Sequence, residues 1–423
     1  MKVLIITYYW PPSGGSGVQR WLKFVKYLQQ YEIEPVVYTV DKPNYVITDK
    51  SLLKEVPDSI EILKRPIKEP NNLLSIFGNK KKQTSAGFLD TSPSFFGKII
   101  QYIRANFFIP DARKYWIKPS VKFLSEYLSK NTIDVLITTG PPHSLHLIGL
   151  QLKQKLNVKW IADFRDPWTA IDYFHQLPLT KKTIQKHHQL EESVVRNADC
   201  VLVIGNVMKK NYLKFNKNIE VITNGFDTVE NSSKVELDSK FTMVHVGMIN
   251  ADRNSKTLWK VVSELIKENE RFAKDFQLKL VGKLADEVIE SIQHYKLTSI
   301  VEVVDYLPHQ DVISFQKSAQ VLLLVVNKVP NAKGIITGKI FEYLQAKRPI
   351  LAIAPVDGDL AAIINTTDSG TVIDFEDEKT LKKTILELYY AYKNHNLISH
   401  SKNIEQYHRK HLTGQLSKII KKL

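Results

Sequence analysis

Short apolar runs alternate with longer amphipathic segments along the whole chain, and this alternation restricts the fold more than any other feature of the sequence. The runs have the length of buried strands, and the segments between them are long enough for helices. Strands and helices in alternation form parallel sheets covered by helices on both faces. The pattern therefore predicts an α/β chain with two doubly wound parallel sheets.

The apolar runs fall into two sets. In the first half they predict strands at 3–7, 34–39, 135–138, 159–162 and 200–204, with helices at 18–30 and 121–129. In the second half they predict strands at 241–246, 277–281, 301–304, 321–325 and 349–353. Residues 40–115, rich in Ser, Asn and Pro and with three adjacent lysines at 80–82, are interpreted as an irregular insertion or lid.

The 423 residues are enough for two domains. An Asn-, Lys- and Ser-rich segment at 206–240 separates the two sets of strands, so we predict domains at 1–205 and 206–402. The last residues, 403–423, have helical apolar spacing and predict a closing helix that packs back on the first domain. Doubly wound sheets bind ligands outside the carboxyl ends of their strands, so we expect the chemistry in those loops, facing a cleft between the domains.

The composition excludes several classes of protein. Cys200 is the single cysteine, so no internal disulfide forms, which fits a reducing compartment. The N-terminal apolar run is too short for a signal peptide, and no stretch is long enough to span a bilayer. The net charge is +15, and residues 1–205 hold 28 Lys and Arg against 18 Asp and Glu, a net charge of +10. This charge favours an anionic partner: nucleic acid, a membrane surface or a phosphorylated substrate.

A glycine-rich loop follows the first predicted strand and opens onto a helix. Its last residues, Gly15, Ser16 and Gly17, let the backbone approach a phosphate or sugar closely. The spacing matches neither the dinucleotide-binding glycine pattern nor a P-loop. An ordinary strand-to-helix turn is the alternative interpretation.

Polar side chains follow two further strands of the first half. His143 comes after the strand at 135–138, where imidazole can contact a substrate or simply pack. Asp163, Arg165 and Asp166 come after the strand at 159–162. Carboxylates can exchange protons and a guanidinium can bind an anion, while a buried ion pair that shapes the loop is the alternative.

The stretch 333–350 predicts an anion site at a helix start. Thr337 and Gly338 lie where the helix begins, so its free amides and positive end face an anion such as a diphosphate. Lys339 adds a full charge, and the carboxylate of Glu342 can accept from the two hydroxyls of a ribose. A plain amphipathic helix with solvated charges is the alternative.

Two further cations, Arg253 and Lys256, follow the strand at 241–246. Each can add charge at a departing phosphate, and each can equally be a solvated surface cation.

Together these motifs make the chain similar to the family 4 glycosyltransferases of the GT-B architecture, in the bacterial branch that makes envelope polysaccharides. The resemblance covers nearly the whole chain, and the order of the motifs is more specific than any one of them. The motifs are the Pro-Pro-x-Gly-Gly loop at 11–15 and the segments at 163–168, 198–199, 224–227 and 338–344.

The resemblance implies two Rossmann-like domains across a cleft and a retaining transfer without a metal ion or a further cofactor. A nucleotide sugar would bind mainly to the second domain, and a glycan or lipid-linked acceptor mainly to the first. The implied catalytic residues are Asp163, Arg165, Asp166, Arg253 and Lys339. The implied donor-binding residues are Gly15, Ser16, Gly17, Lys256, Thr337, Gly338 and Glu342, and His143 would contact the acceptor.

Two positions depart from the family pattern. Many members carry a glutamate eight positions before the one matched by Glu342, where this chain has Gly334. Where many members have a histidine after the strand that leads to the acceptor site, this chain has Arg165. The Asp357-Gly358-Asp359 triplet resembles a metal-binding motif, but its place before an apolar helix favours a turn and helix cap.

Residues 95–108 mix aromatic residues with cations. With the basic first half, they predict a cytoplasmic protein that associates peripherally with the anionic inner face of the membrane. A helix packed on its own domain is the alternative.

Two other functions remain open at this point. A nucleotide-sugar epimerase or hydrolase of the same architecture would share the diphosphate site. A non-catalytic protein would bind a nucleotide sugar or glycan without turnover. Nucleic-acid binding is not expected, because the sequence has neither a nucleic-acid motif nor an aromatic stacking array.

Overall fold

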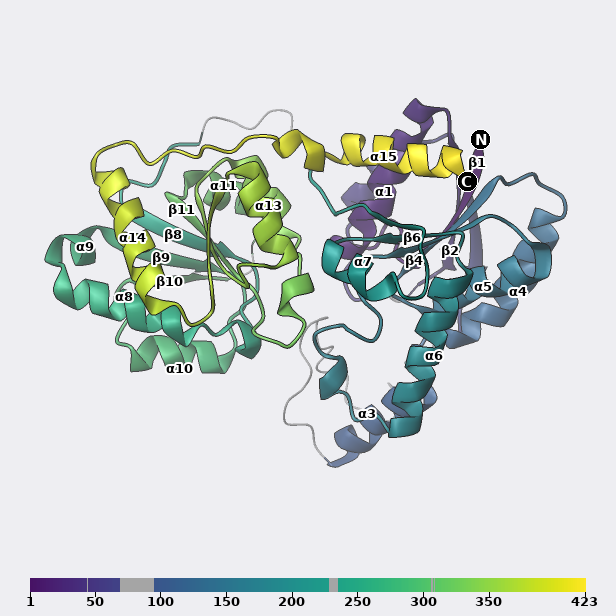
Figure 1. Cartoon of the computed structure of the whole chain (residues 1–423), viewed down its shortest axis with the longest axis horizontal. Helices are drawn as coiled ribbons and strands as arrows, with labels where there is room; N and C mark the ends of the chain where they lie inside the picture. Colours follow the sequence, from purple (N-terminus) through teal and green to yellow (C-terminus); the bar gives the residue numbers. More distant parts are fainter. Residues whose placement is uncertain (44, 69–94, 228–234, 306, 308) are drawn as a thin grey trace. The chain divides into compact units, whose positions relative to one another are not determined.

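The computed structural model describes residues 1–43, 45–68, 95–227, 235–305, 307 and 309–423. The chain forms two compact units (Figure 1). The first comprises Met1–Asn224 and Arg409–Leu423, and the second comprises Gly225–His408. Each unit has its own parallel sheet with helices on both faces, as the alternation of strands and helices predicts.

The first sheet has seven strands in the order β3-β2-β1-β4-β5-β6-β7. The order reverses between β1 and β4, and such a switch point is where doubly wound sheets bind ligands. The strands are β1 (Lys2–Ile6), β2 (Glu34–Asp41), β3 (Glu61–Pro66), β4 (Val135–Gly140), β5 (Trp160–Phe164), β6 (Cys200–Val203) and β7 (Ile219–Val221).

Helices cover both faces of this sheet because successive strand residues point to opposite sides. In β1, Val3 and Ile5 join one core cluster, and Leu4 and Ile6 join the other. The helices are α1 (Ser16–Leu28), α3 (Phe95–Phe107), α4 (Lys114–Leu128), α5 (Ser144–Leu156), α6 (Lys181–Asn197), α7 (Asn206–Tyr212) and α15 (Arg409–Lys422), with short helices η1 (Gln29–Tyr31), η2 (Lys50–Glu55) and η3 (Phe174–Gln176).

The second sheet has six strands in the order β10-β9-β8-β11-β12-β13, with its switch point between β8 and β11. The strands are β8 (Phe241–Val246), β9 (Phe276–Val281), β10 (Val301–Val304), β11 (Val321–Val325), β12 (Ile350–Ile353) and β13 (Gly370–Ile373). The helices are α8 (Lys256–Glu268), α9 (Glu270–Asp275), α10 (Asp286–His294), α11 (His309–Ser318), α12 (Lys339–Ala346), α13 (Asp359–Thr367) and α14 (Glu378–Lys393), with short helices η4 (Ala251–Arg253), η5 (Ala332–Gly334) and η6 (Ile404–Tyr407).

Three edge strands, β3, β7 and β13, are absent from the sequence-based prediction. Edge strands are short or partly polar, so they lack the continuous apolar run that marks a central parallel strand. The interpretation of residues 40–115 as an irregular insertion was wrong where it covers β3, η2, α3 and the start of α4. The lysines at 80–82 lie outside the described residues.

The division between the units falls after Asn224, whereas the sequence placed it after residue 205. The reason is β7, which pairs with β6 and extends the first sheet. The closing helix α15 lies in the first unit, where Leu412, Leu416 and Ile420 join the core cluster of α1. Among the described residues, no helix combines the length and hydropathy needed to cross a bilayer.

Candidate functional site

A lysine and a histidine meet at the switch point of the second sheet. Lys339 is the first residue of α12, and its Nζ lies 3.2 Å from Nε2 of His245, a buried residue of β8. His245 Nδ1 lies 3.1 Å from the carbonyl oxygen of Leu323 in β11. Because a carbonyl only accepts, Nδ1 carries the proton, and Nε2 accepts from the ammonium.

The backbone after β8 makes room for this lysine. Gly247 has a φ of 97°, and a Cβ there would lie 2.6 Å from Lys339 Cε. Both the conformation and the space therefore require glycine at this position.

Lys339 lacks a carboxylate partner. Burial, and after it the charge of Arg253, lowers the pKa of Lys339 to about 7, against the opposing effect of Glu342. Burial is the main cause that holds the pKa of His245 well below its usual value, and the charges of Lys339 and Arg253 lower it as well. This histidine is therefore neutral. In the described part of the chain no carboxylate forms an ion pair with Lys339. Two cations close together without a carboxylate on the lysine make a site for an anion.

The start of α12 is open next to Lys339. Gly338 is the N-cap, it is exposed, and a Cβ there would meet nothing within 4 Å. Thr337 Oγ1 accepts from Lys339 N at 3.4 Å. Free amides at an exposed helix start can receive an anion directly.

The other predicted residues of this unit, Glu342, Arg253 and Lys256, each have different surroundings. Glu342, one helical turn further on, accepts a hydrogen bond from Gln316 Nε2 at 2.8 Å. Arg253 ends η4 and donates from Nη1 to Met248 O at 3.1 Å. Lys256 is exposed at the first residue of α8 and shares no described hydrogen bond with the others.

The Asp357-Gly358-Asp359 triplet forms a turn and helix start. Asp357 pairs with Lys333 at 2.5 Å, Gly358 is the N-cap of α13, and Asp359 is its first residue.

In the first unit, Asp163 is fully buried inside β5. Its oxygens accept from Arg20 Nη2 at 2.9 Å, Trp21 Nε1 at 2.7 Å and Thr139 Oγ1 at 2.8 Å. Burial acts to raise the pKa of Asp163, but Arg20 and these hydrogen bonds hold it below its usual value. Asp163 therefore forms a buried ion pair with Arg20, which is the alternative given in the sequence analysis, and its catalytic role stays a prediction.

Arg20 is the partner that sequence reasoning missed. Its guanidinium also donates to the carbonyls of Ile222 at 2.9 Å and Thr223 at 2.7 Å. It therefore ties α1 to β5 and to the segment after β7. The available signal was an arginine next to Trp21 on the apolar side of a predicted helix, where a buried carboxylate is the expected partner.

Arg165 and Asp166 differ in exposure. Arg165 is buried and donates to Gly17 O at 2.5 Å and to the carbonyl of Pro141, so it joins the glycine loop to the end of β4. Asp166 is half-buried, and burial raises its pKa while Arg165 opposes the rise. Of the two predicted carboxylates, Asp166 is the one that reaches solvent.

His143 is largely enclosed. Its ring stacks on Trp168 with centroids 4.8 Å apart, and only 9% of its surface is exposed. Burial, and after it the neighbouring His146, holds its pKa well below the usual value. His143 therefore packs as a neutral ring in this structure, and its contact with an acceptor stays a prediction.

The glycine loop leaves the start of α1 open. Gly15 is the N-cap with a φ of 81°, and a Cβ there would meet nothing within 4 Å. Ser16 is the first residue of α1, and Gly17 follows. These residues lie after β1, beside the switch point of the first sheet.

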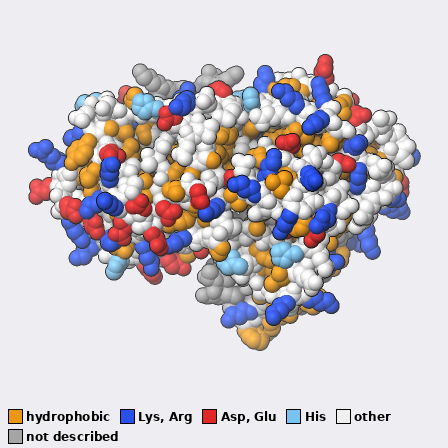
Figure 2. All heavy atoms as spheres, viewed as in Figure 1, with side chains coloured by type: hydrophobic (Ala, Val, Ile, Leu, Met, Phe, Trp, Pro, Cys, Tyr) orange, Lys and Arg blue, Asp and Glu red, His pale blue; other side chains and the backbone are white. Residues whose placement is uncertain are grey.

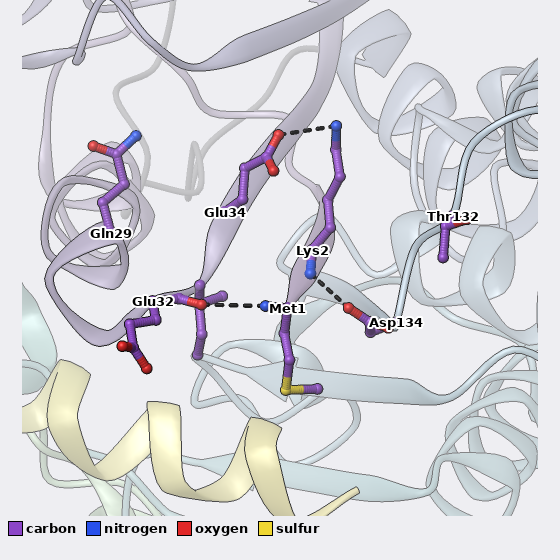
Figure 3. A pocket seen from close by; sticks show the side chains of 8 residues that line it. Met1, Lys2, Gln29, Glu32, Glu34, Thr132 and Asp134 are labelled. Atoms are coloured by element: carbon purple, nitrogen blue, oxygen red, sulfur yellow. Dashed lines mark hydrogen bonds and ion pairs between the residues drawn. The ribbon is translucent and has the colours of Figure 1, made fainter.

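A pocket in the first unit lies at the amino ends of the strands of the first sheet, whereas the glycine loop follows the carboxyl end of β1 (Figure 3). It is lined at the amino ends of β1 and β2, where Lys2 pairs with Glu34 at 2.9 Å and donates its backbone N–H to Asp134. Lys2 thus contacts both Glu34 and Asp134 within the lining, and none of the predicted site residues lines this pocket.

Sequence models of two glycosyltransferase families match the chain. Residues 86–230 match Glycosyltransferase Family 4, and residues 240–390 match Glycosyl transferases group 1. No curated protein matches the sequence.

Solved structures with the same fold include a sucrose-phosphate synthase, a protein bound to UDP and glucose, and a putative epimerase. Sucrose-phosphate synthase (tll1590) from Thermosynechococcus elongatus has a TM-score of 0.62 at 14% identity, covering 100% of this chain and 98% of its own. Anabaena Alr3699/HepE, solved with UDP and glucose, has a TM-score of 0.62 at 12% identity, covering 100% of both chains. A putative UDP-N-acetylglucosamine 2-epimerase from Listeria monocytogenes has a TM-score of 0.56 at 13% identity, covering 99% of this chain and 95% of its own.

At such identities the likeness establishes the fold, which is shared by transferases and epimerases, and the family matches identify the transferase. The chain belongs to the family 4 glycosyltransferases and has the GT-B architecture.

Proposed function

We propose that the second unit binds the diphosphate of a nucleotide sugar, and that the chain transfers this sugar to a glycan or lipid-linked acceptor bound by the first unit. The observation that carries the proposal is Lys339 at the switch point of the second sheet, beside the open start of α12, with the charge of Arg253 acting on it. A diphosphate supplies the negative charge with which Lys339 is not paired among the described residues.

The proposed reaction retains the anomeric configuration. The bond from the anomeric carbon to the diphosphate breaks, the diphosphate leaves with the electron pair, and the acceptor oxygen bonds to the same face of the sugar. The acceptor proton passes to the departing diphosphate. Lys339, Arg253 and the amides at Gly338 stabilise the charge that develops there, which is the main contribution of the protein, and no metal ion takes part. Glu342 binds the ribose.

On the acceptor side, Asp166 is the group proposed to orient the attacking hydroxyl. Its half-buried position and raised pKa support this role, because a carboxylate of higher pKa is a better hydrogen-bond acceptor for a hydroxyl. Arg165 holds the neighbouring loops and acts as a positioning residue.

The proposed setting is the synthesis of envelope polysaccharides, with the enzyme in the cytoplasm and peripherally bound at the inner face of the membrane. The basic first half of the chain, with a net charge of +10 in residues 1–205, supports this location.

The test is a thermal-shift titration of the full chain with UDP, GDP, ADP and CMP, because a ligand that binds the folded state alone raises the melting temperature. We expect one diphosphate to stabilise the protein, and the same nucleotide as its sugar to support transfer to extracted lipid-linked acceptors in the presence of a chelator. Product NMR then reads the anomeric configuration.

Two outcomes would contradict the proposal. Stabilisation by none of the nucleotides would indicate a non-catalytic member. Conversion of the nucleotide sugar without any acceptor would indicate an epimerase or hydrolase.

A further inference from the structure

Helix α3 turns its large apolar side chains outward. Phe95 and Phe96 are each 74% exposed and Phe107 is 64% exposed, while no residue of the helix is buried. Ile99, Ile100, Tyr102 and Ile103 are 36–45% exposed. A helix that only covers its own domain places such residues inward, so the exposed face of α3 indicates a partner.

The apolar residues form one continuous face. At about 100° per residue, the seven apolar side chains occupy an arc of about 160°. Gly97, Gln101 and Ala105 lie on the opposite side and are half-buried. Asn106 fixes the end of the helix, since it donates to Pro178 O at 2.8 Å and accepts from Thr180 N at the start of α6.

Two cations border this face. Lys98 and Arg104 lie about 40° outside its two edges on the same helical geometry, and neither forms an ion pair with the described residues. No acidic residue occurs from 95 to 110. Figure 2 shows apolar side chains at the lower tip of the view, where Figure 1 places α3, with Lys and Arg beside them.

We propose that α3 is a lipid-docking helix that binds the surface of an anionic bilayer. The three phenylalanines enter the boundary between headgroups and acyl chains. Lys98 and Arg104 extend along the edges of the face to the phosphate groups, as amphipathic cations do at such interfaces. The inference deepens the membrane location proposed above by naming its element and its lipid chemistry.

A second copy of the chain would also cover an apolar face. The bordering cations favour the bilayer, because two copies of this face would bring four cations together without a carboxylate to pair them.

The experiment is flotation of the full chain with vesicles of phosphatidylcholine alone or mixed with phosphatidylglycerol. We expect binding to the mixed vesicles that weakens as salt rises. The combined variant Phe95→Ser, Phe96→Ser and Phe107→Ser loses binding by roughly tenfold for each phenylalanine. The combined variant Lys98→Gln and Arg104→Gln loses about fivefold for each cation on mixed vesicles and little on neutral ones.

Matched controls lie on the second unit. Tyr390 and Ile398 are 54% and 60% exposed, so the pair Tyr390→Ser and Ile398→Ser removes two exposed apolar side chains outside α3 and should leave binding unchanged. The pair Lys379→Gln and Lys383→Gln removes two exposed cations from α14 and should also leave it unchanged.

Three results would overturn the proposal: no flotation with either vesicle, equal flotation with both vesicles and no effect of the cation variant, or a dimer in light scattering that the phenylalanine variant dissociates. Thermal stabilisation by nucleotide, measured on the same variants, separates this test from the donor proposal. It should persist in all of them, because α3 and the donor site belong to different units.

Discussion

At the scale of single residues, the proposed donor site depends on a lysine that forms no ion pair with a carboxylate of the described residues. Lys339 is oriented by a neutral histidine and accommodated by a glycine, so its charge remains available to an anion. The sequence predicts Lys339 from its place at a helix start, but it does not predict His245, which reads as one more residue of an apolar strand.

Lys339→Ala should weaken diphosphate binding by about tenfold to a hundredfold, the value of a charge-assisted contact. In the parent protein, affinity should fall as pH rises above about 7, because the ammonium whose pKa is about 7 then loses its proton. The variant should lose this pH dependence. Calorimetric titration between about pH 7 and 9 checks both effects, because the nucleotide itself is fully ionised there.

The control is Lys379→Ala, which removes an exposed cation of α14 and should change neither affinity nor its pH dependence. A pH dependence that persists in Lys339→Ala would assign the titration to another group.

His245→Leu should weaken diphosphate binding by about tenfold, because the acceptor that orients Lys339 is removed. The fold should survive, since Leu323 O still accepts from Tyr343 Oη at 3.2 Å. His245→Gln keeps an acceptor and should recover part of the affinity. Equal affinity in the leucine variant and the parent, measured by calorimetry, would show that Lys339 needs no such support.

Substitutions of Asp163 and Asp166 should have different effects: the first should lower stability, and the second should lower turnover. Asp163→Asn leaves Arg20 charged and buried without its carboxylate, which costs about 3–5 kcal/mol of unfolding free energy. Asp166→Asn should stay within about 0.5 kcal/mol of the parent in stability and lose turnover. Urea unfolding and a transfer assay distinguish them.

The ion pair of Asp163 and Arg20 also makes the stability of the protein depend on pH. Because the folded pKa of Asp163 lies below its unfolded value, its contribution is present above the unfolded pKa and is lost as pH falls through the folded one. As pH falls between the unfolded and the folded pKa of Asp163, the parent should therefore lose stability more steeply than Asp163→Asn. Circular dichroism of acid unfolding measures this difference. Parallel acid unfolding curves would contradict this.

At the scale of elements, every central strand of the described sheets was predicted from the sequence, whereas three of their four edge strands were not. Strands such as β4 and β11 are buried on both faces, so their sequences are continuous apolar runs. β3 reads Glu-Ile-Leu-Lys-Arg-Pro and is mostly exposed or half-buried, so its pairing with β2 defines it, rather than its own pattern. The aromatic and cationic residues at 95–108 predicted a segment that contacts a membrane, but the helical conformation of α3 and the side that it turns outward required the structure.

The turn after β8 should tolerate no side chain. Gly247→Ala should destabilise the protein by about 1–3 kcal/mol, because the positive φ is strained for alanine and the added Cβ meets the Lys339 stem. It should also weaken diphosphate binding. Gly338→Ala is the matched control, with a φ of −57° and open space, and should change stability by only a few tenths of a kcal/mol. Equal melting temperatures of the two variants would contradict this account.

At the scale of the whole molecule, the chain leaves the first unit after Asn224 and returns to it at Arg409. The last helix, α15, packs on the first, α1, so the two ends of the chain stabilise one core cluster. The first unit is therefore complete only when the second has been synthesised.

Leu416→Ala should destabilise the first unit by about 2–5 kcal/mol, because Leu416 is fully buried against the α1 cluster. Hydrogen exchange should show a loss of amide protection in β1 and α1 and no such loss in β8 and α8. Lys418→Ala, an exposed neighbour on the same helix, should stay within about 0.5 kcal/mol. Uniform loss of protection in both units would contradict the division.

The sequence by itself determined the α/β class, the two parallel sheets and the family, and it located the two cations of the proposed donor site. These features are carried by local periodicity and by short motifs, and both are readable along one dimension. Only the tertiary structure decided that Asp163 is a buried partner of Arg20, that His143 packs on Trp168, and that His245 meets Lys339. Each of these contacts joins residues from different elements. The role of such a side chain is set by burial and by its partner, and neither quantity is encoded at a single position.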